Sequence, residues 1–144
     1  MNQSHKTAIK RNKLSTPMKY LKERGLLTGK MLDYGSGFGN DAQLIGMEQY
    51  DKHYQPIYPK GRQFDRITCN YVLNVATGSE QVEILTNIHE LLTTDGSAYI
   101  SVRNDLKMPK QKGRGCIQVQ VHLTLPIVTQ NSNFRMYRMT KNSY

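Results

Sequence analysis

The residue pattern with the clearest chemical meaning is an acidic residue followed by three glycines at alternate positions. It begins at Asp33, includes Gly35 and Gly37, and follows an apolar run that predicts a strand over residues 30–34. Glycine has no Cβ, so its backbone can turn sharply and approach a ligand closely. Helical sequence over residues 40–46 follows directly. A strand, a glycine turn and a helix in this order are typical of sites that hold a nucleoside-bearing cofactor.

The spacing of the glycines argues against a dinucleotide cofactor. The dinucleotide fingerprint G-x-G-x-x-G requires its third glycine at position 40, where this chain has Asn40. A second carboxylate is expected about 20 residues downstream, at the end of the next strand, where it would bond ribose hydroxyls. Asp51 occupies that place, after a strand predicted over residues 47–51. The alternative interpretation is an ordinary glycine turn beside a surface Asp33.

This arrangement resembles motif I of the class I S-adenosylmethionine (SAM)-dependent methyltransferases. In that family the residue that matches Asp33 faces the amino-acid end of SAM, and a carboxylate suits the methionine ammonium group. By position, Gly35 and Gly37 would also line the methionine end, and Asp51 would hold the ribose. The resemblance therefore implies SAM as the cofactor and a truncated Rossmann-like α/β fold.

A longer series of motifs narrows the resemblance. It covers roughly residues 6–104 and comprises segments 7–11, 32–41, 50–56 and 70–75, with a short late element around Arg114. In this order the segments are similar to the methyltransferase-like proteins associated with bacterial DNA phosphorothioation gene clusters. The resemblance implies that Asn70 and Tyr71, at the exit of a central strand, lie beside the transferred methyl group as catalytic residues, with Asn70 also contacting the cofactor.

The remaining sequence predicts one domain over residues 15–144, preceded by a flexible basic arm over residues 1–14. The first predicted helix runs from Thr16-Pro17 to Gly25. A strand over 64–73 follows later, and then a helix over 78–92 that begins with a Thr77/Glu80 capping box. A turn at Asp95-Gly96 leads to a strand over 98–102. Only about a dozen residues separate Asp51 from the strand that follows, and a crossover with its helix needs at least that many. We therefore expect the helix–strand–helix insertion usual in this fold to be reduced to a loop.

The C-terminal part predicts strands rather than helices. Residues 117–123 alternate apolar and polar side chains, including His122, and predict a half-exposed strand. A turn over 129–133 and a strand over 134–139 follow. The predicted fold class is thus α/β, with a mostly parallel sheet and an antiparallel hairpin within residues 117–140.

Charge and composition indicate the kind of partner. The formal net charge is +9 and the pI is near 9.6, which favours contact with a nucleic acid. A basic loop follows the end of a predicted strand, where ligands bind in open α/β sheets. We expect DNA or RNA to contact this loop and the N-terminal arm through phosphates, with solvation alone as the alternative. The basic side chains of the loop are Lys107, Lys110, Lys112 and Arg114.

Several classes of protein are not expected. Cys69 and Cys116 have no C-x-x-C partner, so neither a zinc site nor a disulfide framework is predicted. No apolar stretch reaches membrane-spanning length, and the basic N-terminus does not resemble a secretory signal. A cytoplasmic location is therefore expected.

The residues around Asn70 restrict the chemistry. Exocyclic amino methylation of DNA bases would require a D/N-P-P-Y/F element, whereas residues 70–73 contain no proline. Cytosine-C5 methylation would require a nucleophilic cysteine after proline, which neither cysteine provides. Tyr71 either contacts the acceptor or forms a wall of the site, and His53 and Tyr54 either flank the adenine or belong to a surface loop. The predicted function is SAM-dependent methyl transfer. The alternative is an inactive or SAM-degrading protein that serves as a subunit or inhibitor in a restriction–modification context.

Overall fold

The structure, a computed structural model, describes residues 13–105, 110–111, 117–118 and 120–144. The helices are α1 (Thr16–Glu23), α2 (Asn40–Ile45) and α3 (Gly78–Leu91), with a 3-10 turn, η2 (Leu73–Val75). The strands are β1 (Met31–Tyr34), β2 (Glu48–Tyr50), β3 (Phe64–Asn70), β4 (Leu92–Arg103), β5 (Lys110–Gln111), β6 (Ile117–Gln118), β7 (Ile127–Gln130) and β8 (Phe134–Met139).

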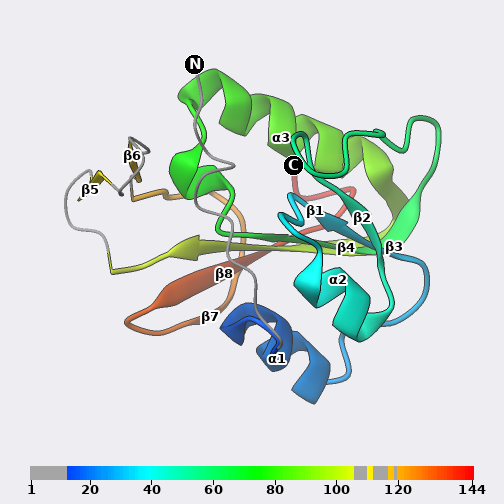
Figure 1. Cartoon of the computed structure of the whole chain (residues 1–144), viewed down its shortest axis with the longest axis horizontal. Coiled ribbons are helices and arrows are strands. Elements are labelled where there is room, and N and C mark those ends of the chain that lie inside the picture. The colour runs from blue at the N-terminus through cyan, green and yellow to red at the C-terminus, as the bar shows by residue number, and fades with distance from the viewer. Residues whose placement is uncertain (1–12, 106–109, 112–116, 119) are drawn as a thin grey trace.

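A six-stranded sheet with the order β2-β1-β3-β4-β8-β7 forms the centre of the molecule (Figure 1). β1 pairs in parallel with β2 and β3, and β3 pairs in parallel with β4. β8 is antiparallel to both of its neighbours, β4 and β7. β7 therefore points in the same direction as β4, and β8 is the reversed strand of this sheet. The predicted α/β class, with a mostly parallel sheet and a C-terminal antiparallel hairpin, is confirmed.

Helices cover both faces of this sheet. α3 lies on one face, and α1 and α2 lie on the other (Figure 1). On the α3 face, Ile88 packs with Ile67 and Ile100 in one buried cluster. On the opposite face, Met18 of α1 and Met136 of β8 belong to a second buried cluster. Burial of these two apolar faces supplies most of the driving force for this arrangement.

The four parallel strands β2, β1, β3 and β4 end at the same border of the sheet, which we call the carboxyl edge. Their last residues are Tyr50, Tyr34, Asn70 and Arg103. In open α/β sheets, ligands bind outside this edge. The fold therefore brings the glycine segment, Asp51 and Asn70 to one place, although they are separated along the chain.

The sequence correctly predicted the start of α3 and the shortened connection between β2 and β3. The Thr77 hydroxyl accepts a hydrogen bond from the Glu80 amide (3.3 Å), and the Glu80 carboxylate accepts one from the Thr77 amide (2.9 Å), so the capping box is confirmed. Between β2 and β3, residues 51–63 form no helix or strand apart from one isolated bridge between Asp51 and Gln55. The predicted reduction of the insertion to a loop is also confirmed.

The predicted strand over residues 117–123 is wrong. Among the described residues of this segment only 117–118 form a strand, which pairs with β5, and the first strand of the C-terminal hairpin is β7. In the segment after β6, Val121 and Leu125 are buried in the α3-side cluster, and the Leu123 amide donates to the Tyr137 hydroxyl (3.2 Å). The alternating pattern thus serves an extended segment that lies over the sheet rather than in it.

Two other boundaries differ from the prediction. The strand predicted over 64–73 ends at Asn70, because Tyr71 adopts a left-handed backbone (φ 62°) that leaves the strand. The predicted turn at Asp95-Gly96 lies inside β4. There the register changes from the pair Phe64–Leu92 to the pair Arg66–Ser97, so β4 carries extra residues that bulge from the ladder.

None of the helices in the described part of the chain is long and apolar enough to span a membrane. Most of the predicted basic arm, residues 1–12, lies outside the described residues, as does Cys116.

Candidate functional site

The glycine segment forms a tight loop over the ends of β1 and β2. Gly35 and Gly37 have positive φ angles of 80° and 58°. The Tyr50 carbonyl at the end of β2 accepts hydrogen bonds from the Gly35 amide (2.7 Å) and the Ser36 amide (3.1 Å). A Cβ on Gly35 would lie 2.4 Å from the Val72 Cγ2 atom, so no larger residue fits at that position.

Asp51 is fastened to this loop. Its Oδ2 accepts a hydrogen bond from the Gly37 amide (2.7 Å), and its Oδ1 accepts from the His53 amide (2.9 Å) and the Tyr54 amide (3.0 Å). The structure thus brings together the loop and the second acid, as the sequence indicated. A carboxylate has about four acceptor positions, so three amide donors leave room for one further donor without rearrangement.

Asp33 lies beneath the loop and is 4% exposed. Its Oδ1 accepts a hydrogen bond from the Thr68 hydroxyl on β3 (2.8 Å). The pKa of Asp33 is raised to about 7, mainly by burial and to a smaller extent by the nearby carboxylates of Asp41 and Asp51, while the Thr68 hydrogen bond opposes the shift. A cation placed beside Asp33 would stabilise its ionised form. Sequence analysis missed Thr68, although its position in an apolar strand was a usable signal.

Polar side chains continue from Asp33 across the sheet toward β4. Asn70 on β3 stands in register with Ser101 on β4. Both side-chain polar atoms of Asn70, and the hydroxyls of Ser101 and Ser36, are buried and have no hydrogen-bond partner in the described structure. Leaving such a group unpaired costs about 1–3 kcal/mol. Unpaired buried groups beside a glycine loop fit a site whose polar ligand supplies the missing partners.

Asn70 and Ser101 face the α1 side of the sheet. Their strand neighbours Cys69 and Ile100 pack in the α3-side cluster, and side chains alternate between faces along a strand. The same alternation places Thr68 on the α1 side, two residues before Asn70. The unpaired groups therefore lie on the same face as the Thr68–Asp33 hydrogen bond.

Tyr71 follows Asn70 with its strained backbone. Its amide donates to the Ser101 carbonyl (2.8 Å), which fixes the exit from β3. Its side chain packs against the α1-side cluster. Left-handed backbone at a residue other than glycine costs about 1–3 kcal/mol and often marks functional sites.

Aromatic rings gather beside Asp51. The Phe38 ring lies 4.5 Å from the Tyr54 ring, and the His53 ring lies 4.6 Å from Tyr54, measured between centroids. Phe38 comes from the glycine loop, and the other two follow Asp51. Sequence analysis considered His53 and Tyr54 but missed Phe38, whose place within the glycine motif was the available signal.

α1 is attached to the same region through Ser15. The Ser15 amide and hydroxyl donate to the two carboxylate oxygens of Asp41 (2.8 and 2.7 Å). Asp41 lies in the first turn of α2, directly after the glycine loop. This pair places the start of α1 at the carboxyl edge, a contact that no local pattern predicted.

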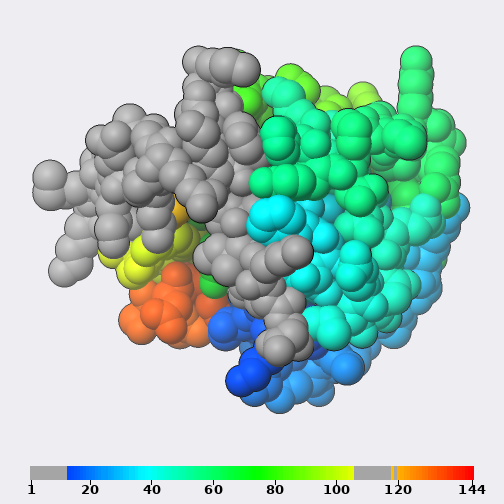
Figure 2. Space-filling model, in the orientation of Figure 1, coloured from blue at the N-terminus to red at the C-terminus, as the bar shows by residue number. Residues whose placement is uncertain are grey.

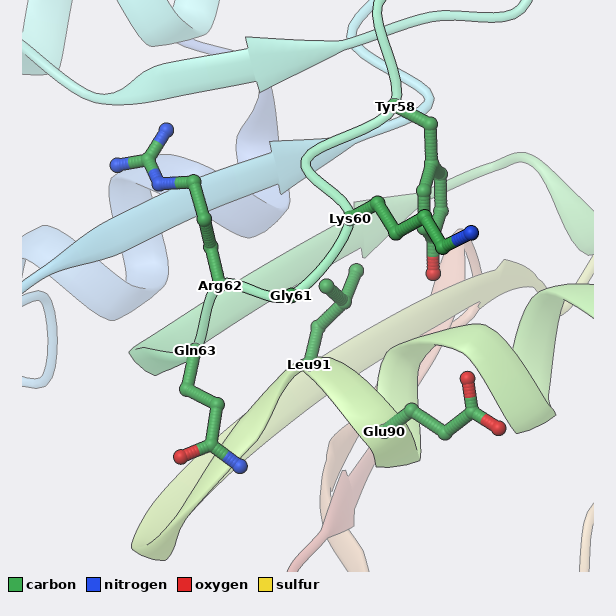
Figure 3. Close-up of a pocket in the computed structure, with 7 residues that line it drawn as sticks. All are labelled: Tyr58, Lys60, Gly61, Arg62, Gln63, Glu90 and Leu91. Carbon is green, nitrogen blue, oxygen red and sulfur yellow. The ribbon is translucent and has the colours of Figure 1, made fainter.

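Other predicted residues are not placed at this site. Lys107, Lys112 and Arg114 lie outside the described residues, and only the backbone of Lys110 is described, in β5. No group of three or more potential metal ligands occurs among the described positions. A cavity of about 400 Å³ lies at the opposite edge of the sheet, before β3 and at the end of α3 (Figure 3). It is lined by Tyr58, Lys60, Gly61, Arg62, Gln63 and Glu90, with Leu91.

Comparisons with known proteins identify the fold. No protein-family model matches the chain, and no curated protein matches it. Among solved structures, the PH0226 protein of Pyrococcus horikoshii is 10% identical, with a TM-score of 0.58 over 85% of this chain and 84% of that one. A TehB-like SAM-dependent methyltransferase of Corynebacterium glutamicum is 18% identical, with a TM-score of 0.54 over 87% and 86% of the two chains. The chain has the class I methyltransferase fold.

A third similar structure is DhpI, solved as a complex with S-adenosylhomocysteine (SAH). It is 11% identical, with a TM-score of 0.53 over 85% of this chain and 86% of that one. The coverage shows that the class I methyltransferase fold extends over most of the present chain.

Proposed function

We propose that this protein binds SAM at the carboxyl edge and transfers its methyl group to an acceptor. The observation that carries the proposal is a glycine loop held between two carboxylates, Asp33 below it and Asp51 bonded to it through Gly37. Support also comes from the fold, because structures with this fold include DhpI with SAH and the glycopeptide N-methyltransferase MtfA with SAM (TM-score 0.50).

The residues present fit such a cofactor. Asp33 would pair with the ammonium group, and ionisation of a buried carboxylate requires such a partner. Asp51 would receive a ribose hydroxyl at its remaining acceptor position. The rings of Phe38 and Tyr54 offer a face for the adenine.

Methyl transfer would require positioning more than acid–base chemistry. Bound SAM supplies an activated methyl carbon, and holding an acceptor in line with it contributes through effective concentration. Asn70 and Ser101 do not ionise near neutral pH, so they would orient the acceptor by hydrogen bonds rather than remove its proton. An acceptor with an available lone pair needs no dedicated base.

We further propose a nucleic acid as the acceptor, in a role related to the phosphorothioation-associated proteins that the sequence resembles. The net charge of +9 and the succession of motifs support this assignment. The absence of proline in residues 70–73 argues against the exocyclic amino groups of DNA bases as the reacting atoms.

A second candidate is a protein that binds SAM without transferring its methyl group, or that degrades SAM. The supporting observation is the loop over residues 51–63, which lacks the helices usual at that place. Such a protein would act as a subunit or inhibitor in a restriction–modification system.

Calorimetry tests cofactor binding, which both candidates require. SAM and SAH should bind, and NAD should not. The Asp51→Asn variant keeps one acceptor oxygen for the loop amides and should bind SAM roughly 10- to 150-fold more weakly, since a charge-assisted hydrogen bond contributes about 1.5–3 kcal/mol. Gly25→Ala, at a surface position with nothing within 4 Å, is the control. Absence of SAM and SAH binding by the folded protein would remove both candidates.

Methyl-labelled SAM then separates the two candidates. Label incorporated into DNA, RNA or protein pools would support transfer and identify the acceptor class. Loss of SAM without incorporation would support degradation. If SAM binds but is neither transferred nor degraded, the result would support a binding subunit.

A further inference from the structure

Two polar side chains at the carboxyl edge lie next to each other without hydrogen-bond partners. Asn70 at the end of β3 and Ser101 on β4 are in register, so they lie about 5 Å apart, the spacing of neighbouring strands. Both face the α1 side of the sheet. Their side-chain polar atoms are buried, and none of these atoms makes a hydrogen bond in the described structure. We call these two side chains the Asn–Ser pair.

Another serine on β4 shows that the lack of a partner is specific to this place. Ser97 lies four residues before Ser101, on the same face of the strand, and is also buried. Its hydroxyl accepts a hydrogen bond from the Arg138 Nε atom (3.0 Å). The fold therefore supplies a partner for the serine near the start of β4, but it supplies none at the carboxyl edge, where ligands bind.

The Asn–Ser pair suits an uncharged group. An amide and a hydroxyl can each donate and accept, so together they satisfy a group that carries a donor beside an acceptor. A buried charge would need an opposite charge nearby. Among the last three residues of β3 and of β4, the only charged one is Arg103. Its guanidinium is already held by the two carboxylate oxygens of Asp105 (2.9 and 2.6 Å).

An aromatic side chain is turned to the same side of the sheet. The alternation of side chains along a strand would place Tyr71, which follows Asn70, on the α3 side. Its left-handed backbone (φ 62°) instead brings the side chain to the α1-side cluster. Such strain persists where the surrounding structure enforces it, and it is concentrated at functional sites. Here the strain places an aromatic ring on the face that carries the Asn–Ser pair.

We propose that the Asn–Ser pair binds the hydrogen-bonding edge of a nucleobase and holds this base beside the methyl group. The edge of a base carries donors and acceptors side by side, and its flat face suits the Tyr71 ring. A peptide unit is less suitable, because the N–H and C=O groups of a trans peptide point in opposite directions. This assignment rests on the proposed function and names the part of the nucleic acid that the site recognises.

The Asn–Ser pair is enclosed by α1. Met18 of α1 belongs to the same buried cluster as Met136, which is in register with Ser101. The start of α1 is joined to α2 by the hydrogen bonds from Ser15 to Asp41, and the two helices lie next to each other (Figures 1 and 2). A base therefore reaches the pair when the start of α1 moves away from α2. Inside such an enclosed site each hydrogen bond is stronger than in water.

Three single variants test the assignment in the SAH-saturated protein, whose cofactor site is filled. Ser101→Ala and Asn70→Leu remove the hydrogen-bonding groups with little change in side-chain volume. Ser97→Ala is the matched control, because it removes a buried hydroxyl from the same face of the same strand at the opposite edge. Calorimetry would measure the binding of adenosine, guanosine, cytidine and uridine, with N-acetylglutamine amide as a carboxamide probe.

At least one nucleoside should bind to the wild-type protein. Ser101→Ala and Asn70→Leu should each weaken this binding roughly two- to tenfold, the factor for one hydrogen bond, while Ser97→Ala stays near wild type. Without ligand, Ser101→Ala should unfold at a higher temperature than the wild type and Ser97→Ala at a lower one, because only the Ser97 hydroxyl has a partner to lose. A purely structural hydroxyl at Ser101 would not combine higher stability with weaker binding.

Binding of no nucleoside, or equal losses of affinity in Ser101→Ala and Ser97→Ala, would overturn the proposal. So would tighter binding of N-acetylglutamine amide than of every nucleoside, which would assign the pair to a protein side chain. The two possible failures remain distinguishable. SAH binding without nucleoside binding would remove the base and keep the cofactor site. Nucleoside binding in the absence of SAH binding would remove the proposed methyl transfer and keep the Asn–Ser pair.

Discussion

The Thr68 hydroxyl on β3 donates a hydrogen bond to the buried carboxylate of Asp33 on β1, at 2.8 Å. The two residues are in register across adjacent parallel strands, so the contact follows from the sheet itself. One neutral donor does not compensate for the removal of a carboxylate from water, and the pKa of Asp33 is accordingly raised to about 7.

This raised pKa predicts how stability depends on pH. Between pH 4 and pH 7 the unfolded chain has released the Asp33 proton while the folded protein keeps it, so the free energy of unfolding should fall as pH rises through this range. The largest possible loss is about 4 kcal/mol, from about three pKa units at 1.36 kcal/mol each. Urea unfolding at a series of pH values would measure it. Asp33→Asn should flatten the curve over this range; an unchanged curve in that variant would contradict the assignment.

The same group should make SAM binding depend on pH. The ammonium group of SAM needs the ionised form of Asp33, whose fraction rises roughly eightfold between pH 6 and pH 7.5 for a pKa near 7. Affinity should therefore increase by about that factor, with proton release on binding below pH 7. Calorimetry in buffers of different ionisation enthalpy would detect the proton. The dependence should disappear in Asp33→Asn, and its persistence there would assign it to another group.

Gly35 should tolerate no side chain. Gly35→Ala would place a Cβ 2.4 Å from Val72 at a φ of 80°, so we expect a loss of about 2–4 kcal/mol in unfolding free energy. Gly25→Ala has a similar φ of 66° but open space, and it should lose only about 1–2 kcal/mol. Adding Val72→Ala to Gly35→Ala should recover the steric part of the loss. Equal effects at the two glycines would show that the contact with Val72 is unimportant.

Removal of two buried hydroxyls should change the free energy of unfolding in opposite directions. The Ser101 hydroxyl has no partner in the described structure, so Ser101→Ala should raise the unfolding free energy by about 1 kcal/mol in the absence of ligand. Thr68→Val removes the donor to Asp33 and should lower it by about 1–3 kcal/mol at neutral pH. Chemical denaturation measures both. A destabilised Ser101→Ala would indicate that this hydroxyl has a structural role.

Features controlled by neighbouring residues were predictable from the sequence. The capping box needs only Thr77 and Glu80, and the glycine loop needs only its own residue types and the strand before it. The predicted mostly parallel sheet also follows from local order, because short connections limit how successive strands can pair. Asp51 could be placed near the loop because its spacing matches the length of one helix and one strand.

Features that depend on residues distant in sequence were not predictable. An alternating segment such as 117–123 satisfies the same pattern in a sheet or lying over one, and only the packing of Val121 and Leu125 distinguishes the two. Likewise, Ser15 pairs with Asp41 and Thr68 pairs with Asp33 across the fold. The lack of a hydrogen-bond partner for the Ser101 hydroxyl is even harder to predict from the sequence, since it depends on the side chains of all the neighbouring strands.

The interior place of β8 has a consequence for biosynthesis. This strand is made after β4 and β7 yet lies between them, so until residue 139 has left the ribosome β7 has no partner in the sheet and β4 has only β3. Before that moment β4 presents an open hydrogen-bonding edge, a known starting point for aggregation. A chain that lacks β8 should thus aggregate more readily through this edge, whereas a chain that includes β8 closes it.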